Sequence, residues 1–279
     1  MDYSKTHKYI VKEFNQKKIP IKNVWFYDHP NFIRREQICN DYLNTYARFV
    51  QTKKYEKSYL EIAEKKIRLI SQILFGELSK DGRLGACVDL AIVFSRILDK
   101  HGIWNYCAKG SLTIEYPDQP HLHSSHFPHC HNDIENKVGH TWLVAPPFQV
   151  VDCTAKLQPY SYDEVNFLPE IVYEKNKNYC QADISDLYDS NVISQFMANG
   201  QGLNMNIFYG MFPYLRKFCS VFKANCISLS DVKMKYVPCG ITFSDKPLEK
   251  IKGLELSGKL GYEIYEDIIL PELNKLQSG

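Results

Sequence analysis

The N-terminal third of the chain carries apolar side chains at three- and four-residue spacing, the pattern of helices with one buried face. Two such runs, residues 34–50 and 59–74, are joined by a short polar connection. The apolar positions are Ile38, Tyr42, Tyr46, Phe49 and Val50 in the first run, and Tyr59, Ile62, Ala63, Ile67, Ile70, Ile73 and Leu74 in the second. A third helix is predicted over residues 86–100, and Gly102 supplies the left-handed residue that commonly ends a helix.

Short β-prone runs replace the helical spacing after Gly102. Residues 104–116, 138–145 and 149–153 are predicted strands, and Pro146-Pro147 fits a turn between the last two. Helices followed by consecutive strands indicate an α+β domain with an antiparallel sheet. Segment 117–137 is a loop by its composition.

Three regions follow from these patterns. We expect an N-terminal helical region over residues 1–80, packed on a core over residues 81–160. Residues 161–279 form an α/β extension that either completes the same domain or forms a small second one. Within this extension, residues 183–197, 207–222 and 261–276 are predicted helices, and residues 232–243 contain strand-like runs.

Composition and charge exclude several classes of protein. The 279 residues include 34 basic and 32 acidic side chains. The chain therefore lacks the excess of basic residues that is typical of nucleic-acid-binding proteins. No run approaches the roughly 18 apolar residues of a membrane span, and the polar N-terminus shows no signal peptide. The nine cysteines are odd in number and contain no CxxC pair, so a zinc ribbon or a secreted disulfide scaffold is not expected. We expect a cytoplasmic protein, or one of another reducing compartment, without a nucleic-acid or membrane partner.

A cysteine, a histidine and an aspartate that follow one another along the chain suggest a reactive thiol. Cys87 starts the third predicted helix, His140 lies in a predicted strand, and Asp152 lies in the next strand. A thiol reacts as its thiolate, and the free N–H groups at a helix start stabilise that anion. A neighbouring imidazole takes the thiol proton, while a carboxylate fixes the orientation of the imidazole. The sequence therefore predicts a Cys-His-Asp triad, with the backbone N–H of Cys87 available to an oxyanion.

The segments LGACVDLAIVFSRILDKHGI and GHTWLVAPPFQVVDCT resemble the transglutaminase-like superfamily, a circularly rearranged relative of the papain-like enzymes. The resemblance is confined to residues 80–156. It implies that Cys87 is the nucleophile, His140 the general base and acid, and Asp152 the orienting acid. It also implies a helix packed on an antiparallel sheet, with the site at their junction. No cofactor is expected.

The predicted activity is thiol-dependent acyl transfer on a protein or peptide substrate. Hydrolysis by a cysteine protease or amidase is favoured, and transfer of the acyl group to an amine is the first alternative. A catalytically inactive interaction protein of the same fold is the second, because buried structural cysteines are common.

Residues close to the triad have competing interpretations. Trp142 shares the strand face of His140 by alternation, so it is either a core residue or one that shields and contacts substrate. Cys153 points away from the site by the same rule. The loop around Cys130 is interpreted first as a polar loop whose histidines are incidental. It also contains weak candidates for a zinc or copper site, or for substrate contacts, and no spacing there matches a standard zinc module. These candidates are His121, His123, His126, His129 and His131. The remaining cysteines are expected to be reduced and mostly buried: Cys39, Cys107, Cys180, Cys219, Cys226 and Cys239.

Overall fold

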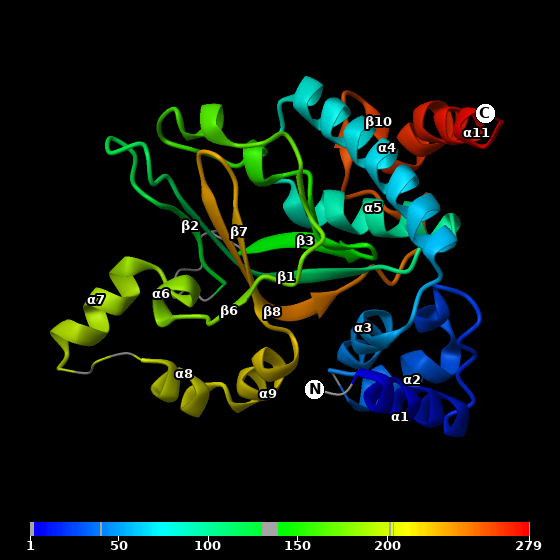
Figure 1. Cartoon of the computed structure of the whole chain (residues 1–279), viewed down its shortest axis with the longest axis horizontal. Helices are drawn as coiled ribbons and strands as arrows, with labels where there is room; N and C mark the ends of the chain where they lie inside the picture. Colours follow the sequence, from blue (N-terminus) through cyan, green and yellow to red (C-terminus); the bar gives the residue numbers. More distant parts are fainter. Residues whose placement is uncertain (1–2, 40, 130–138, 201, 203, 279) are drawn as a thin grey trace.

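The computed structural model describes residues 3–39, 41–129, 139–200, 202 and 204–278 (Figure 1). The helices are α1 (Tyr3–Gln16), α2 (Pro30–Ile38), α3 (Leu43–Thr52), α4 (Lys57–Asp81), α5 (Cys87–Lys100), α6 (Ile184–Leu187), α7 (Ser190–Ala198), α8 (Met205–Met211), α9 (Pro213–Val221), α10 (Gly261–Ile264) and α11 (Leu270–Ser278). The strands are β1 (Tyr106–Glu115), β2 (Ser125–Phe127), β3 (His140–Ala145), β4 (Phe148–Asp152), β5 (Val172–Glu174), β6 (Tyr179–Cys180), β7 (Ala224–Ser228), β8 (Lys233–Thr242), β9 (Glu255–Leu256) and β10 (Lys259–Leu260).

One antiparallel sheet organises the molecule. Its strand order is β5-β4-β3-β1-β8-β7-β6, and β2 pairs with part of β1. The long central strands β1 and β8 pair along most of their length. Strands β5 to β8 come from residues 161–279, so this extension contributes to the same sheet as the strands of the predicted core. The α+β class predicted from the sequence is confirmed.

Alternation along the strands divides the core between the two faces of the sheet. Leu143, Val151 and Cys153 face α4 and α5, in a cluster that also includes α10 and α11. Trp142 and Val150 face the other way, in a cluster that includes α1, α2 and α3. In Figure 1, α4, α5 and α11 accordingly lie together on one side, and α1 to α3 lie in a separate group.

Helix α5 has the bounds expected from its pattern. It begins at Cys87 and ends at Lys100, and Gly102 follows with φ of 69°. Its buried Arg96 ties distant segments together, since its guanidinium donates to both carboxylate oxygens of Asp28 at 2.6 and 2.9 Å and to the carbonyl of Ser244 at 2.6 Å. The N-terminal region and the end of β8 are thereby held against the helix that carries the predicted nucleophile.

Three predicted helices are each divided in the structure. Residues 34–50 belong to α2 and α3, because Ile38 ends α2 with its side chain 77% exposed and does not continue the buried face. Residues 183–197 are divided where Asp189 caps α7 by accepting from the N–H of Asn191 at 2.8 Å. Residues 207–222 are divided at Pro213, which opens α9 and has no N–H to continue the preceding helix.

Two further segments differ in detail from the sequence pattern. The predicted loop 117–137 contains strand β2, which pairs with β1 at Leu112 to Ile114. Residues 261–276 are helical as predicted, with a π-helical stretch over Tyr265–Ile269. No helix in the described part of the chain has the length and apolarity that a membrane crossing requires.

The prediction for the remaining cysteines is partly wrong. Cys180 and Cys226 form a disulfide, because pairing of β6 with β7 brings their Cα atoms to 6.0 Å although 46 residues separate them in the sequence. Cys107 and Cys239 are buried, Cys219 is half-buried, and Cys39 is exposed. Cys153 packs in the core on the opposite face of β4 from Asp152, as alternation predicted.

Candidate active site

Cys87 opens α5 next to the start of β3. The chain reaches the helix through Gly85, whose φ of 70° suits glycine and whose N–H donates to the carbonyl of Leu157 at 3.0 Å. The Cys87 sulfur lies 4.0 Å from the carbonyl oxygen of Gly139, and Cys87 is only 5% exposed. The first N–H groups of a helix have no partner within it, so the sulfur lies at a partially positive helix end.

His140 and Asp152 are held side by side by the pairing of β3 with β4. His140 is the first residue of β3 and Asp152 is the last of β4, with the turn at Pro146-Pro147 between the strands. Nε2 of His140 lies 2.6 Å from Oδ2 of Asp152, and both side chains are at most 1% exposed. The two strands thus form the imidazole–carboxylate pair that the sequence order predicted.

The carboxylate of Asp152 has additional donors. Its Oδ1 accepts from the N–H and hydroxyl of Thr154 at 2.8 and 2.9 Å and from the N–H of Ala155 at 3.1 Å. Its Oδ2 accepts from the hydroxyl of Tyr236 at 2.9 Å as well as bonding to His140. Burial by itself would raise the pKa of Asp152, but the charge of His140 and the hydrogen bonds from His140 and Thr154 lower it. Asp152 is therefore ionised at neutral pH.

The attraction between the two groups also keeps the imidazole of His140 protonated. Burial opposes the charged form, yet the charge and hydrogen bond of Asp152, with a smaller contribution from Cys87, raise the pKa of His140 to about 10. The other ring nitrogen, Nδ1, makes no hydrogen bond within the described part of the chain. Because Nε2 is occupied by Asp152, Nδ1 is the ring nitrogen left for the Cys87 thiol.

Aromatic rings surround the imidazole. The indole of Trp142 lies nearly parallel to it, with ring centroids 6.4 Å apart and planes 17° apart. The ring of Tyr236 meets Trp142 edge-on at 5.1 Å. Trp142 is 3% exposed, so it shields the imidazole–carboxylate pair from water, and its contact with substrate stays a prediction. The cavity beside the thiol holds about 10 Å³, which is too small for a substrate.

Two residues of this site had no signal in the sequence. Tyr236 reaches Asp152 from β8, 84 residues away. Gly110 of β1 pairs with His140 at a bulge, where a Cβ atom would lie 1.9 Å from the carbonyl oxygen of Val237. Neither role is visible before the strand order and register are known.

The described histidines of the histidine-rich segment, His121, His123, His126 and His129, do not come together as a metal cluster. His121 lies 3.5 Å from a carboxylate oxygen of Asp163 and is exposed, and His123 is exposed too. Both ring nitrogens of His126 have partners, the hydroxyl of Thr113 and the carbonyl of Tyr188. His129 lies in the described chain just after β2, whereas Cys130 and His131 lie outside the described residues. Among the residues that the structure describes, no group of three or more His, Cys, Asp or Glu side chains is arranged to hold a metal ion.

Comparisons with family models, with curated proteins and with solved structures give no match for this chain.

Proposed function

We propose that this protein is a thiol-dependent acyl-transfer enzyme of the transglutaminase-like type, which hydrolyses a peptide or carboxamide bond. The observation that carries the proposal is the 2.6 Å contact between Nε2 of His140 and Oδ2 of Asp152 beside the thiol at the start of α5. This contact leaves Nδ1 of His140 for Cys87, which is the arrangement that a Cys-His-Asp triad requires. The motif resemblance over residues 80–156 supports the same class.

The proposed reaction has two halves. His140 holds the thiol proton while the thiolate attacks the carbonyl carbon, so a C–S bond forms and the carbonyl oxygen becomes an oxyanion. The free N–H of Cys87 at the helix start is the proposed donor to that oxyanion. Collapse of this intermediate breaks the C–N bond as the imidazolium protonates the leaving amine. Water then attacks the thioester with His140 as base, which releases the acid and restores the thiol.

Water is the proposed acceptor because it needs no second binding site. An amine in its place would give transamidation through the same first half. The choice is tested by incubating the protein with fluorogenic peptide amides, with and without a fluorescent primary amine. Hydrolysis without incorporation of the amine supports the proposal, and incorporation in preference to hydrolysis favours the transamidase.

The nucleophile is tested separately by alkylation. We expect iodoacetamide at pH 6 to label Cys87 faster than the exposed Cys39, although Cys87 is the more buried thiol. Cys87→Ala abolishes turnover, and Cys39→Ala is the control that leaves it unchanged. Equal or slower labelling of Cys87, with no turnover of any peptide amide, would favour an inactive interaction protein.

A further inference from the structure

Helix α1 presents a row of lysines to solvent. Lys5, Lys8 and Lys12 are exposed and recur at three- and four-residue spacing, so they lie on one face of the helix. We call this the lysine face. The opposite face of α1 packs into the core through Ile10 and Phe14. In Figure 1, α1 lies at the lower margin of the group formed by α1 to α3.

Positive charge is concentrated in the part of the chain that contains this face. Residues 3–25 include six lysines and one acidic residue, the half-buried Glu13. The rest of the chain holds the other 28 of the 34 basic residues and the other 31 of the 32 acidic residues, so its net charge is negative. The near-neutral charge of the whole chain therefore does not describe the charge of this surface.

The lysines of this segment are not neutralised by neighbouring carboxylates. Lys8, Lys12, Lys18 and Lys22 are exposed, and none forms an ion pair with a carboxylate of the described residues. Two of them border a shallow, open hollow along α1. This hollow is lined by His7, Lys8, Val11, Lys12, Asn15 and Gln16. An anionic group that enters the hollow meets Lys8 and Lys12 without displacing an existing ion pair.

The side-chain types of this segment favour a lipid surface over a protein or a nucleic acid. The segment contains lysine and no arginine, whereas arginine is the cation enriched in protein interfaces and in nucleic-acid recognition. Tyr9 is 70% exposed and Trp25 is 42% exposed. Tyrosine and tryptophan are the side chains enriched where a membrane meets water. Clustered lysines are attracted to the negative surface potential of an anionic lipid leaflet.

We propose that the lysine face of α1 binds an anionic lipid surface. Lys8 and Lys12 pair with the phosphate and carboxylate groups of the lipid headgroups, and Tyr9 lies among them. Ile10 and Phe14 stay in the core, so α1 lies on the membrane and does not insert. The sequence predicted no membrane partner because no run is long enough to span a bilayer, but a peripheral contact does not require such a run. The inference goes beyond the proposed function and does not depend on it.

Sedimentation with lipid vesicles tests the inference on the intact chain. Vesicles of phosphatidylcholine alone are compared with vesicles in which about a third of the lipid is phosphatidylserine, at an ionic strength of about 0.1 M. We expect at least tenfold tighter binding to the vesicles that contain phosphatidylserine. Raising the ionic strength to about 1 M should release the protein, because salt screens exposed charges. No binding to either vesicle, or equal binding to both, would overturn the inference.

Two variants with the same net charge locate the contact. Lys8→Glu combined with Lys12→Glu reverses two charges on the lysine face. Lys250→Glu combined with Lys252→Glu is the matched control, because both lysines are exposed and lie between β8 and β9. We expect the α1 variant to bind phosphatidylserine vesicles at least tenfold more weakly and the control to stay within about twofold of wild type. Equal losses in the two variants would show a nonspecific charge effect and overturn the inference.

Two further measurements separate the remaining outcomes. If thermal unfolding shows that the α1 variant is unfolded, Lys8→Gln with Lys12→Gln replaces it, and unchanged vesicle binding by that variant contradicts the inference. A short DNA duplex is the competing polyanion, and tighter binding to it than to vesicles, with the same dependence on Lys8 and Lys12, would assign the lysine face to nucleic acid instead. Cys87→Ala should bind vesicles as wild type does, so loss of the proposed hydrolysis leaves this inference unaffected.

Discussion

Replacing Tyr236 by phenylalanine removes one hydroxyl from the candidate site and little else. Tyr236 is fully buried, and its hydroxyl donates to Oδ2 of Asp152 at 2.9 Å. A phenyl ring retains the edge-on contact with Trp142. Asp152 keeps its bonds to His140 and to the segment beginning at Thr154, so the carboxylate is not left without partners. The variant therefore isolates the contribution of one hydrogen bond to a charged acceptor.

The expected magnitude follows from that charge. Hydrogen bonds to charged groups contribute about 1.5–3 kcal/mol, so the free energy of unfolding of Tyr236→Phe should fall by that amount. The hydroxyl also helps to hold the carboxylate that orients His140. If 1.4 kcal/mol of this energy stabilises the thiolate–imidazolium form, the equilibrium constant for that form falls about tenfold, and its population falls by at most this factor. We therefore expect alkylation of Cys87 at pH 7 to slow by up to about tenfold.

Two assays and one control check this reasoning. Urea unfolding at pH 7 measures the stability, and iodoacetamide labelling between pH 5 and 9 measures the reactivity of Cys87. Tyr46→Phe is the matched control, because Tyr46 is also fully buried and its hydroxyl donates to the carbonyl of Val24 at 2.6 Å, in a different part of the fold. The control should lose stability and keep the labelling profile. A stability within about 0.5 kcal/mol of wild type and an unchanged labelling profile for Tyr236→Phe would refute the role given to this hydroxyl.

Three further predictions concern stability. The pKa of His140 is raised from 6.5 to about 10, so the stability that the charged imidazole contributes is complete below pH 6.5 and is lost as the pH rises through 10. Between pH 7 and pH 9.5, the free energy of unfolding in urea should therefore fall more in the wild-type protein than in His140→Asn. Cys226→Ser opens the loop that the disulfide closes across 46 residues, and it should lower the free energy of unfolding by up to about 4 kcal/mol. The difference should disappear when the wild-type and variant proteins are both measured under reducing conditions. Gly110→Ala should destabilise by at least about 2 kcal/mol because its Cβ would meet backbone at 1.9 Å, whereas Gly202→Ala, with open space around it, should stay within about 0.5 kcal/mol in thermal unfolding.

The elements that carry the candidate triad were predictable from local patterns. Helix α5 follows from apolar spacing and from the stop at Gly102, and β3 and β4 follow from β-prone runs around Pro146-Pro147. Two adjacent antiparallel strands joined by a tight turn bring nearby side chains of one face together. That local geometry explains why the contact between His140 and Asp152 was predictable across only 12 residues.

Other features were not evident from the pattern of apolar residues. The breaks that divide three of the predicted helices come from single residues such as Pro213, which interrupt an otherwise continuous apolar pattern. The Cys180–Cys226 disulfide depends on β6 pairing with β7, and β6 is only two residues long. A two-residue strand has too few positions for an alternation pattern, so its pairing had no sequence signal.

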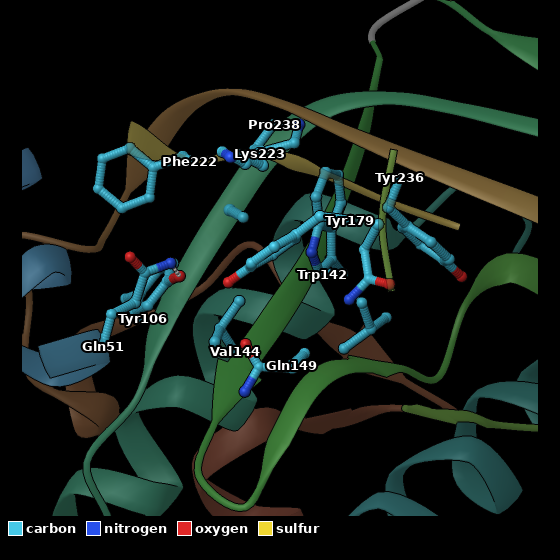
Figure 2. A pocket seen from close by; sticks show the side chains of 13 residues that line it. Gln51, Tyr106, Trp142, Val144, Gln149, Tyr179, Phe222, Lys223, Tyr236 and Pro238 are labelled. Atoms are coloured by element: carbon cyan, nitrogen blue, oxygen red, sulfur yellow. Dashed lines mark hydrogen bonds between the residues drawn. The ribbon is translucent and has the colours of Figure 1, made fainter. Parts of the chain in front are cut away.

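The sequence by itself determined the α+β class, the helix that begins at Cys87 and the paired strands of His140 and Asp152, because each depends on neighbours within about 15 residues of the chain. Only the tertiary structure decided that Tyr236 bonds to Asp152, that Gly110 makes room at the bulge beside His140, and that Lys223 and Asn225 line one small cavity with Trp142 (Figure 2). These placements follow from β8 and β7 joining the sheet next to β1. Strand order depends on the burial of whole faces rather than on any local pattern, and it therefore becomes visible only when the sheet is assembled.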